Sequence, residues 1–188
     1  ALLAVARDQL FAQIVLPVAH DRRQFGVDLR GIDLDRFALA RTPAIDLLAK
    51  EGVRCTNAIT TAPITLPAHA SIMTGLLPPA HGVRDNGAYM LSNEYTTLAE
   101  VLKQNGYNTG AFVSAVVLAK RYNLSQGFDV YDDNFYAEDE PKLFMIRDRP
   151  AQRTAERAVA WLQEQHLTNK PFFLWVHFFD PHQPYQSR

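Results

Sequence analysis

The sequence predicts an α/β domain in which a mostly parallel sheet carries helices on both of its faces. Helical and strand patterns alternate along the 188 residues, and this alternation is typical of strand–helix–strand units. The segment 172–179 is a continuous apolar run, as expected for a strand that is covered on both faces. With 47% hydrophobic residues, the chain has the composition of a globular domain with one core.

The first half of the chain is expected to contribute short strands at 14–19 and 53–59, with a helix between them. Thr42 has a side chain suited to capping that helix, and Pro43 is favoured in a first helical turn. Gly52 can end the helix, because glycine adopts the left-handed conformation without strain.

The second half continues the alternation. Thr97 and Glu100 have the spacing of a capping box for a helix that ends near Gly106, and 109–114 is then predicted to be a strand. The charged and aromatic stretch 131–149 is expected to be a flexible excursion. A longer helix after it is predicted to turn one apolar face inward, formed by Ala151, Ala155, Ala158, Val159 and Leu162.

The segment 65–86, which reads TLPAHASIMTG followed by LLPPAHGVRDN, carries the strongest chemical signal. Pro67 suits a first helical turn, and Gly75 can close that helix. The hydroxyl of Thr65 is therefore expected beside unpaired backbone N–H groups and the positive end of the helix dipole, where an anion is stabilised. Attack on a phosphate or sulfate ester requires an oxygen nucleophile at such a site. The alternative is a threonine that only caps a surface helix.

From Thr42 to Tyr185 the chain resembles the amino-terminal part of a sulfatase-like hydrolase of the alkaline phosphatase superfamily. The resemblance rests on an ordered series of segments: 42–54, 65–86, 97–107, 127–129, PFFLWVH at 171–177 and DPHQPY at 180–185. It implies an alkaline-phosphatase-like fold and metal-dependent ester hydrolysis. It also implies a divergent segment at 1–41, followed by a partial sulfatase-like domain at 42–188.

The resemblance also bears on the nucleophile. Sulfatases carry Cys or Ser in a Cys-x-Pro-x-Arg motif, and that residue is oxidised to formylglycine. Here Thr65 takes this position, Pro67 keeps the proline, and His69 replaces the arginine. Oxidation of a threonine would give a ketone, so the segment resembles at least as much the nucleotide pyrophosphatase/phosphodiesterase branch, where an unmodified threonine attacks phosphorus. Thr65 is thus predicted to be a direct nucleophile, for which phosphate esters are better suited than sulfate esters.

Six other side chains receive expected roles, those of Asn86 and His182 from the resemblance. Asn86 is predicted to donate its amide N–H to a non-bridging oxygen of the substrate, the alternative being a turn residue in Asp-Asn-Gly. His182 is predicted to contact the substrate or donate a proton, and His177 and Asp180 are weaker candidates. His69 is expected to support the nucleophile helix. His81 is expected to shape the glycine turn that follows it.

A divalent metal (zinc, calcium or manganese) is expected to activate the threonine, because its hydroxyl is too weakly acidic to ionise alone. The candidate ligands are Thr65 and either Asp21 or Asp28. In the family, further ligands lie beyond the Asp-Pro-His segment, and this sequence stops before them. The chain is therefore expected to be truncated at its carboxyl end and, taken alone, poorly equipped to hold the metal.

The composition and charge of the chain indicate which classes of partner are not supported. The net charge is −1 and there is no run of Lys or Arg, which gives no support to nucleic-acid binding. The single cysteine, Cys55, excludes an internal disulfide and a multi-cysteine zinc site. No apolar stretch is long enough to span a membrane, and the apolar segment 1–6 is broken by charge at Arg7 and Asp8, unlike a signal peptide. The resemblance nevertheless implies a periplasmic or other extracytoplasmic setting.

The expected partner is an anionic ester of a small molecule, a glycan or a lipid. Two other functions fit the same sequence. One is a phospho-group transferase of the same superfamily, and the other is a truncated or degenerate domain that keeps the fold without activity.

Overall fold

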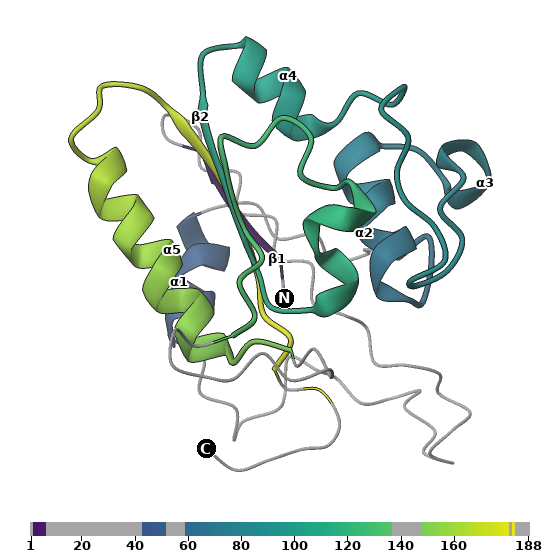
Figure 1. The fold of residues 1–188 in the computed structure, drawn as a ribbon. Coiled ribbons are helices and arrows are strands. Elements are labelled where there is room, and N and C mark those ends of the chain that lie inside the picture. Colours follow the sequence, from purple (N-terminus) through teal and green to yellow (C-terminus); the bar gives the residue numbers. More distant parts are fainter. Residues whose placement is uncertain (1, 7–42, 52–58, 137–147, 181, 183–188) are drawn as a thin grey trace.

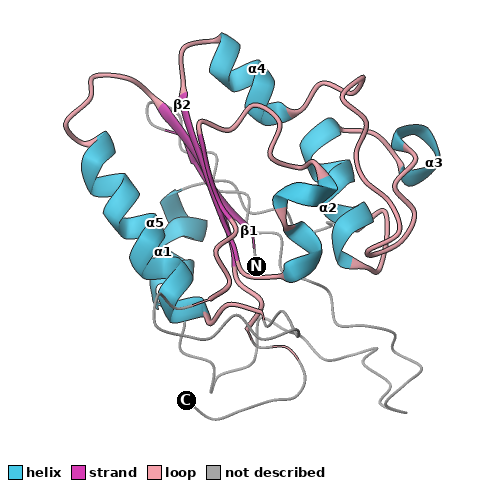
Figure 2. Cartoon of the chain, viewed as in Figure 1, coloured by secondary structure: helices cyan, strands magenta, loops and turns pink. Residues whose placement is uncertain are grey.

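The computed structural model describes residues 2–6, 43–51, 59–136, 148–180 and 182. Within them, a single four-stranded sheet lies between helices (Figures 1 and 2), in the strand order β1-β4-β2-β3. β2 is parallel to both of its neighbours, and β1 pairs antiparallel with β4. The predicted α/β class with a mostly parallel sheet is confirmed. The strands are β1 (Leu2–Ala6), β2 (Asn108–Val113), β3 (Val130–Asp132) and β4 (Phe172–His177).

Helices cover both faces of this sheet. Figure 1 shows α5 on one side and α2 and α4 on the other. None of the helices in the described ranges is long and apolar enough to cross a membrane. The helices are α1 (Pro43–Glu51), α2 (Thr65–Thr74), α3 (Pro78–His81), α4 (Leu98–Gln104) and α5 (Ala151–Gln165), with short 3-10 turns η2 (Val116–Leu118) and η3 (Lys120–Tyr122).

The two central strands divide the core because successive side chains point to opposite faces. On the α5 side, Phe112, Leu174 and Val176 pack with Ala158 and Trp161. On the other side, the larger cluster contains Ala111, Val113, Phe173 and Trp175 from the sheet, together with Leu66, Ala70 and Met73 from α2. The apolar run of β4, from Phe172 to Val176, follows from this double burial.

Several predicted boundaries agree with the structure. The strand predicted at 109–114 is β2, and the apolar run from Phe172 forms β4 as far as His177. Thr97 caps α4, with the Thr97 and Glu100 side chains and backbones bonded reciprocally as a capping box. The strand predicted at 14–19 lies outside the described residues, as do 53–58. Ile59, the end of the second predicted strand, is in no strand and is 85% exposed.

The helix itself is confirmed, and its predicted inward face is confirmed in part, since Ala158 is buried and Leu162 packs against the core. The buried residues are Thr154, Ala158, Trp161 and Gln165, whereas Val159 is 51% exposed. The error has a physical reason: both polar residues on the true face find partners. Thr154 bonds Ser114 Oγ at 2.6 Å and Gln165 accepts from Asn108 Nδ2 at 2.9 Å, so burial leaves neither side chain unsatisfied.

The flexible excursion predicted at 131–149 is also wrong at both of its ends. Tyr131 is buried in β3, and the Arg149 side chain is fully buried, where it bonds Asp132 Oδ1 at 2.7 Å. Here an aromatic residue packs in the core and charged residues form a buried ion pair. Composition alone does not distinguish such a segment from an exposed loop. Residues 137–147 lie outside the described part.

Candidate active site

Helix α2 begins where the sequence predicts it, with Thr65 as its first residue. Ile64 is the N-cap, with extended backbone (φ −126°, ψ 151°), and Gly75 ends the helix in the left-handed conformation at φ 71°. The alternative of a capping threonine does not hold, since Ile64 takes that position. The Thr65 hydroxyl is partly exposed and forms no hydrogen bond to another described residue. It is therefore available to a ligand at the positive end of the helix.

Asn86 is joined to the same helix end, twenty residues further along the chain. Its Oδ1 accepts a hydrogen bond from the Leu66 N–H at 2.8 Å. An N–H can only donate, so the amide oxygen faces the helix and the Nδ2 group is left as a donor. This contact also satisfies one of the orphan N–H groups of the first turn. The structure thus brings the predicted nucleophile and the predicted amide donor to one place.

His69 lies one turn after Thr65 and supports the helix, as expected. Its Nδ1 is 2.7 Å from the Thr65 carbonyl oxygen, and because a carbonyl only accepts, Nδ1 carries the proton. The ring stacks on Trp175 at 5.7 Å and meets the edge of His177 at 5.0 Å between centroids. Burial lowers the pKa of His69 to about 4, so the ring is neutral near pH 7 and Nε2 is an acceptor.

His177 is the last residue of β4 and is 7% exposed. Its Nδ1 is buried and has no hydrogen-bond partner among the described residues, as is also true of the indole nitrogen of Trp175. Burial lowers the pKa of His177 well below its ordinary value, and the neighbouring His69 acts in the same direction. Two neutral imidazoles therefore lie where helix α2 meets the carboxyl end of the central strand β4.

His81 has the structural role that the sequence analysis gives it. It is buried, with Nε2 3.0 Å from Ser71 Oγ and Nδ1 accepting from the Val83 N–H at 3.1 Å. Burial lowers its pKa. These bonds hold the turn at Gly82 (φ 78°) against α2 and thereby lead the chain toward Asn86.

The Asp-Pro-His segment after β4 has one role that the sequence analysis missed. Asp180 Oδ2 accepts from the Ala151 N–H at 2.6 Å, so this carboxylate satisfies a first-turn donor of α5. Its N-cap, Pro150, has no side chain able to do so, and that is the signal that could have suggested a distant carboxylate. His182 is exposed and stacks on Phe179 at 4.2 Å; it forms no hydrogen bond to Thr65.

The described residues do not fit a divalent-metal site. Among them, no group of three or more His, Cys, Asp or Glu side chains could hold an ion. The Thr65 hydroxyl offers a single oxygen, whereas calcium and magnesium are bound by about six or more oxygens. Asp21 and Asp28, the predicted ligands, lie outside the described residues, as does Cys55.

Comparisons with known proteins identify the family of the chain. The family model described as Sulfatase matches residues 20–188. An ulvan-active sulfatase of Formosa agariphila is 32% identical over 166 residues, covering 78% of this chain and 32% of the relative. Arylsulfatase K of Rattus norvegicus is 28% identical over 161 residues, covering 79% of this chain and 28% of the relative. The chain thus spans about a third of the length of these relatives.

One solved structure with a similar fold is a protein in complex with its substrate, D-glucosamine-2-N,6-O-disulfate. It superposes with a TM-score of 0.60 and 24% sequence identity, over 77% of this chain and 30% of that chain.

Proposed function

Because this chain belongs to the sulfatase family, we propose that it carries the nucleophile of a sulfate-ester hydrolase and that Thr65 is that nucleophile. The observation that carries the proposal is the free Thr65 hydroxyl at the first residue of α2, next to an Asn86 amide whose oxygen is already bonded to the helix. The other hydrogen-bonding end of that amide is then directed to whatever anion binds beside Thr65.

The proposed reaction has two steps. In the first, Thr65 Oγ1 forms a bond to the sulfur of the ester, the bond from sulfur to the alcohol oxygen breaks, and the alcohol leaves with the proton lost by the hydroxyl. In the second, water cleaves the threonyl ester, which releases sulfate and restores the hydroxyl. Asn86 Nδ2 would donate to a non-bridging oxygen on which charge develops, and His182 would contact the substrate.

Sulfatases generally use a divalent metal, and no step of this proposal runs through one because the described residues do not form its site. The neutral His69 holds the Thr65 carbonyl and keeps the first turn of α2 in place. This imidazole stands where the sulfatase motif has an arginine, so the helix end is stabilised without adding a positive charge beside the nucleophile.

The substrate class is proposed from the neighbour that binds D-glucosamine-2-N,6-O-disulfate: a sulfated amino sugar of a glycan. Phosphate esters are the second candidate. They are favoured by Thr65 itself, since a threonine cannot be converted to the aldehyde that other sulfatases use.

Covalent labelling of the helix end tests the proposal. The chain would be incubated with an aryl sulfate or an aryl phosphate, quenched in acid, and digested for mass spectrometry of the peptide that contains residue 65. We expect the wild type and a Thr74→Ala control, changed at the far end of the same helix, to gain one sulfuryl or phosphoryl group, and Thr65→Ala to gain none. A wild type without label, or hydrolysis undiminished in Thr65→Ala, would contradict the assignment.

A further inference from the structure

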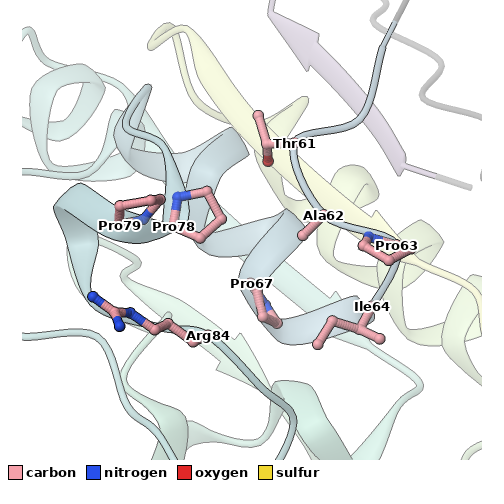
Figure 3. A pocket seen from close by; sticks show the side chains of 8 residues that line it. All are labelled: Thr61, Ala62, Pro63, Ile64, Pro67, Pro78, Pro79 and Arg84. Carbon is pink, nitrogen blue, oxygen red and sulfur yellow. The ribbon is translucent and has the colours of Figure 1, made fainter.

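An apolar pocket opens beside the start of α2 (Figure 3). Its volume is about 420 Å³, within the range of small-molecule sites in proteins. In Figure 3, Pro78, Pro79 and Arg84 line one side, and the segment 62–64 lines the other, with Pro67 of α2 between them. Arg84 is the one charged residue among the lining residues of this pocket. We call it the proline–arginine pocket, after Arg84 and the prolines that line it.

Arg84 is the charged residue of this pocket. Its side chain is exposed and forms no ion pair or hydrogen bond with any residue that the structure describes. The adjacent carboxylate of Asp85 accepts from the Asn86 N–H at 2.7 Å instead. A guanidinium presents a planar fork of donors that fits a carboxylate, sulfate or phosphate group. The pocket therefore combines mostly apolar walls with a cation that has no partner among the described residues.

The pocket and the candidate active site share the same two chain segments. Ile64, on the pocket wall, directly precedes Thr65, so their Cα atoms are about 3.8 Å apart. Arg84 is two residues before Asn86, which keeps their Cα atoms within about 7 Å of each other. A ligand whose ester group lies between Thr65 and Asn86 can thus place a neighbouring part in this pocket.

Resting on the proposed sulfate-ester hydrolysis, we propose that the proline–arginine pocket is a substrate subsite that holds a sugar ring and that Arg84 pairs with a second anionic group on that sugar. The faces of a pyranose ring carry C–H groups, which lose little by leaving water for a surface of proline rings. The second anion supplies the partner that Arg84 lacks. Thr65 and Asn86 would then contact the reacting ester group, and Arg84 would bind the second anion.

Binding measurements with two matched sugars test this inference. Isothermal titration of the chain would compare N-acetylglucosamine 6-sulfate with glucosamine 2-N,6-O-disulfate, in which a second sulfate replaces the neutral acetyl group on nitrogen. We expect the wild type to bind the disulfate about fivefold more tightly, the ratio that one partly exposed ion pair provides. Arg84→Ala should lose this preference. Arg121→Ala, which removes an exposed arginine from η3, should keep it.

Because Arg84 is exposed and has no partner in the described part of the chain, Arg84→Ala is expected to unfold at the same temperature as the wild type. A preference for the disulfate that survives in Arg84→Ala, or that is absent from the wild type, would overturn the subsite. Failure of the proposed function gives a different result: no label on Thr65, while the Arg84-dependent preference persists. Conversely, labelled Thr65 without any effect of Arg84→Ala would leave the catalytic proposal and remove only the subsite.

Discussion

Two arginines bind the same carboxylate from different environments, and this difference predicts unequal effects of their removal. Arg149 bonds Asp132 Oδ1 at 2.7 Å and its side chain is 0% exposed, whereas Arg157 bonds Asp132 Oδ2 and its side chain is 47% exposed. Arg149 also donates to the Asn134 carbonyl at 3.3 Å and to Thr154 Oγ1 at 3.0 Å. The buried arginine therefore satisfies the fully buried Thr154 hydroxyl and the Asp132 carboxylate, whose side chain is only 8% exposed.

Arg149→Met keeps most of the buried volume but removes every one of these donors. Breaking a buried ion pair from one side costs about 3 to 5 kcal/mol, because the other partner stays in a poorly solvated place. Arg157→Met should cost at most about 1 kcal/mol, as is usual for an exposed pair. Each variant removes one positive charge that pairs with the Asp132 carboxylate, so each is the control for the other.

Urea denaturation followed by tryptophan fluorescence measures the difference. With a slope of about 2 kcal/mol per molar urea, the Arg149→Met midpoint should fall by about 2 M and the Arg157→Met midpoint by less than about 0.5 M. Equal shifts for the two variants would refute the reasoning, because burial would then have no bearing on the strength of the pair.

Two further predictions concern the sheet and its histidines. Gly110→Ala should lower the free energy of unfolding by about 1 to 3 kcal/mol, because the added Cβ would lie 2.8 Å from the Trp161 ring; the double variant Gly110→Ala/Trp161→Leu should recover part of the loss in the same urea assay. The pKa of His69 is lowered from 6.5 to about 4, so between these pH values the unfolded chain binds a proton at His69 and the folded chain does not. The free energy of unfolding is therefore highest above pH 6.5 and decreases as the pH falls toward 4. The loss amounts to about 3 kcal/mol, with His177 adding in the same direction; unfolding midpoints from pH 7 to 4.5 should decline less steeply in His69→Gln, and an equal decline would contradict the buried neutral ring.

Much of the fold could be predicted from local patterns. The capping box at Thr97, the helix from Pro43 and the glycine end at Gly75 each depend on contacts within a few residues, and the sequence displays all of these groups side by side. The strand at 172–177 was predictable because burial on both faces demands an unbroken apolar run.

The inward face of α5 could not be predicted in the same way. Thr154 and Gln165 face the core because Ser114 and Asn108, forty and fifty-seven residues away, supply their hydrogen bonds. The hydrophobic pattern predicts these two polar positions to be exposed, because Ser114 and Asn108 come close to them only once the sheet forms. The buried Arg149 was missed for the same reason.

The candidate site shows the same division between local and distant information. The helix start at Thr65 is local and was predicted to within one residue. The Asn86 role was predicted by resemblance, but the bond of its Oδ1 to Leu66 N–H, which fixes which end of the amide is free, required the fold. The proximity of His69 and His177 was not predicted, because it depends on how α2 packs against β4.

The bonds at the carboxyl ends of the strands explain why the start of α2, with Thr65, can be held in one position. Arg149 joins β3 to the start of α5 and donates its backbone N–H to Ser114, directly after β2, at 2.8 Å. Asp180, after β4, bonds the next residues of the same helix through Ala151. Three strand ends are therefore tied to one helix, and β4 in turn presents His177 and Trp175 to the His69 ring on α2. Each link is buried or hydrogen-bonded, so the position of Thr65 is set by the sheet rather than by the ten residues of its own short helix.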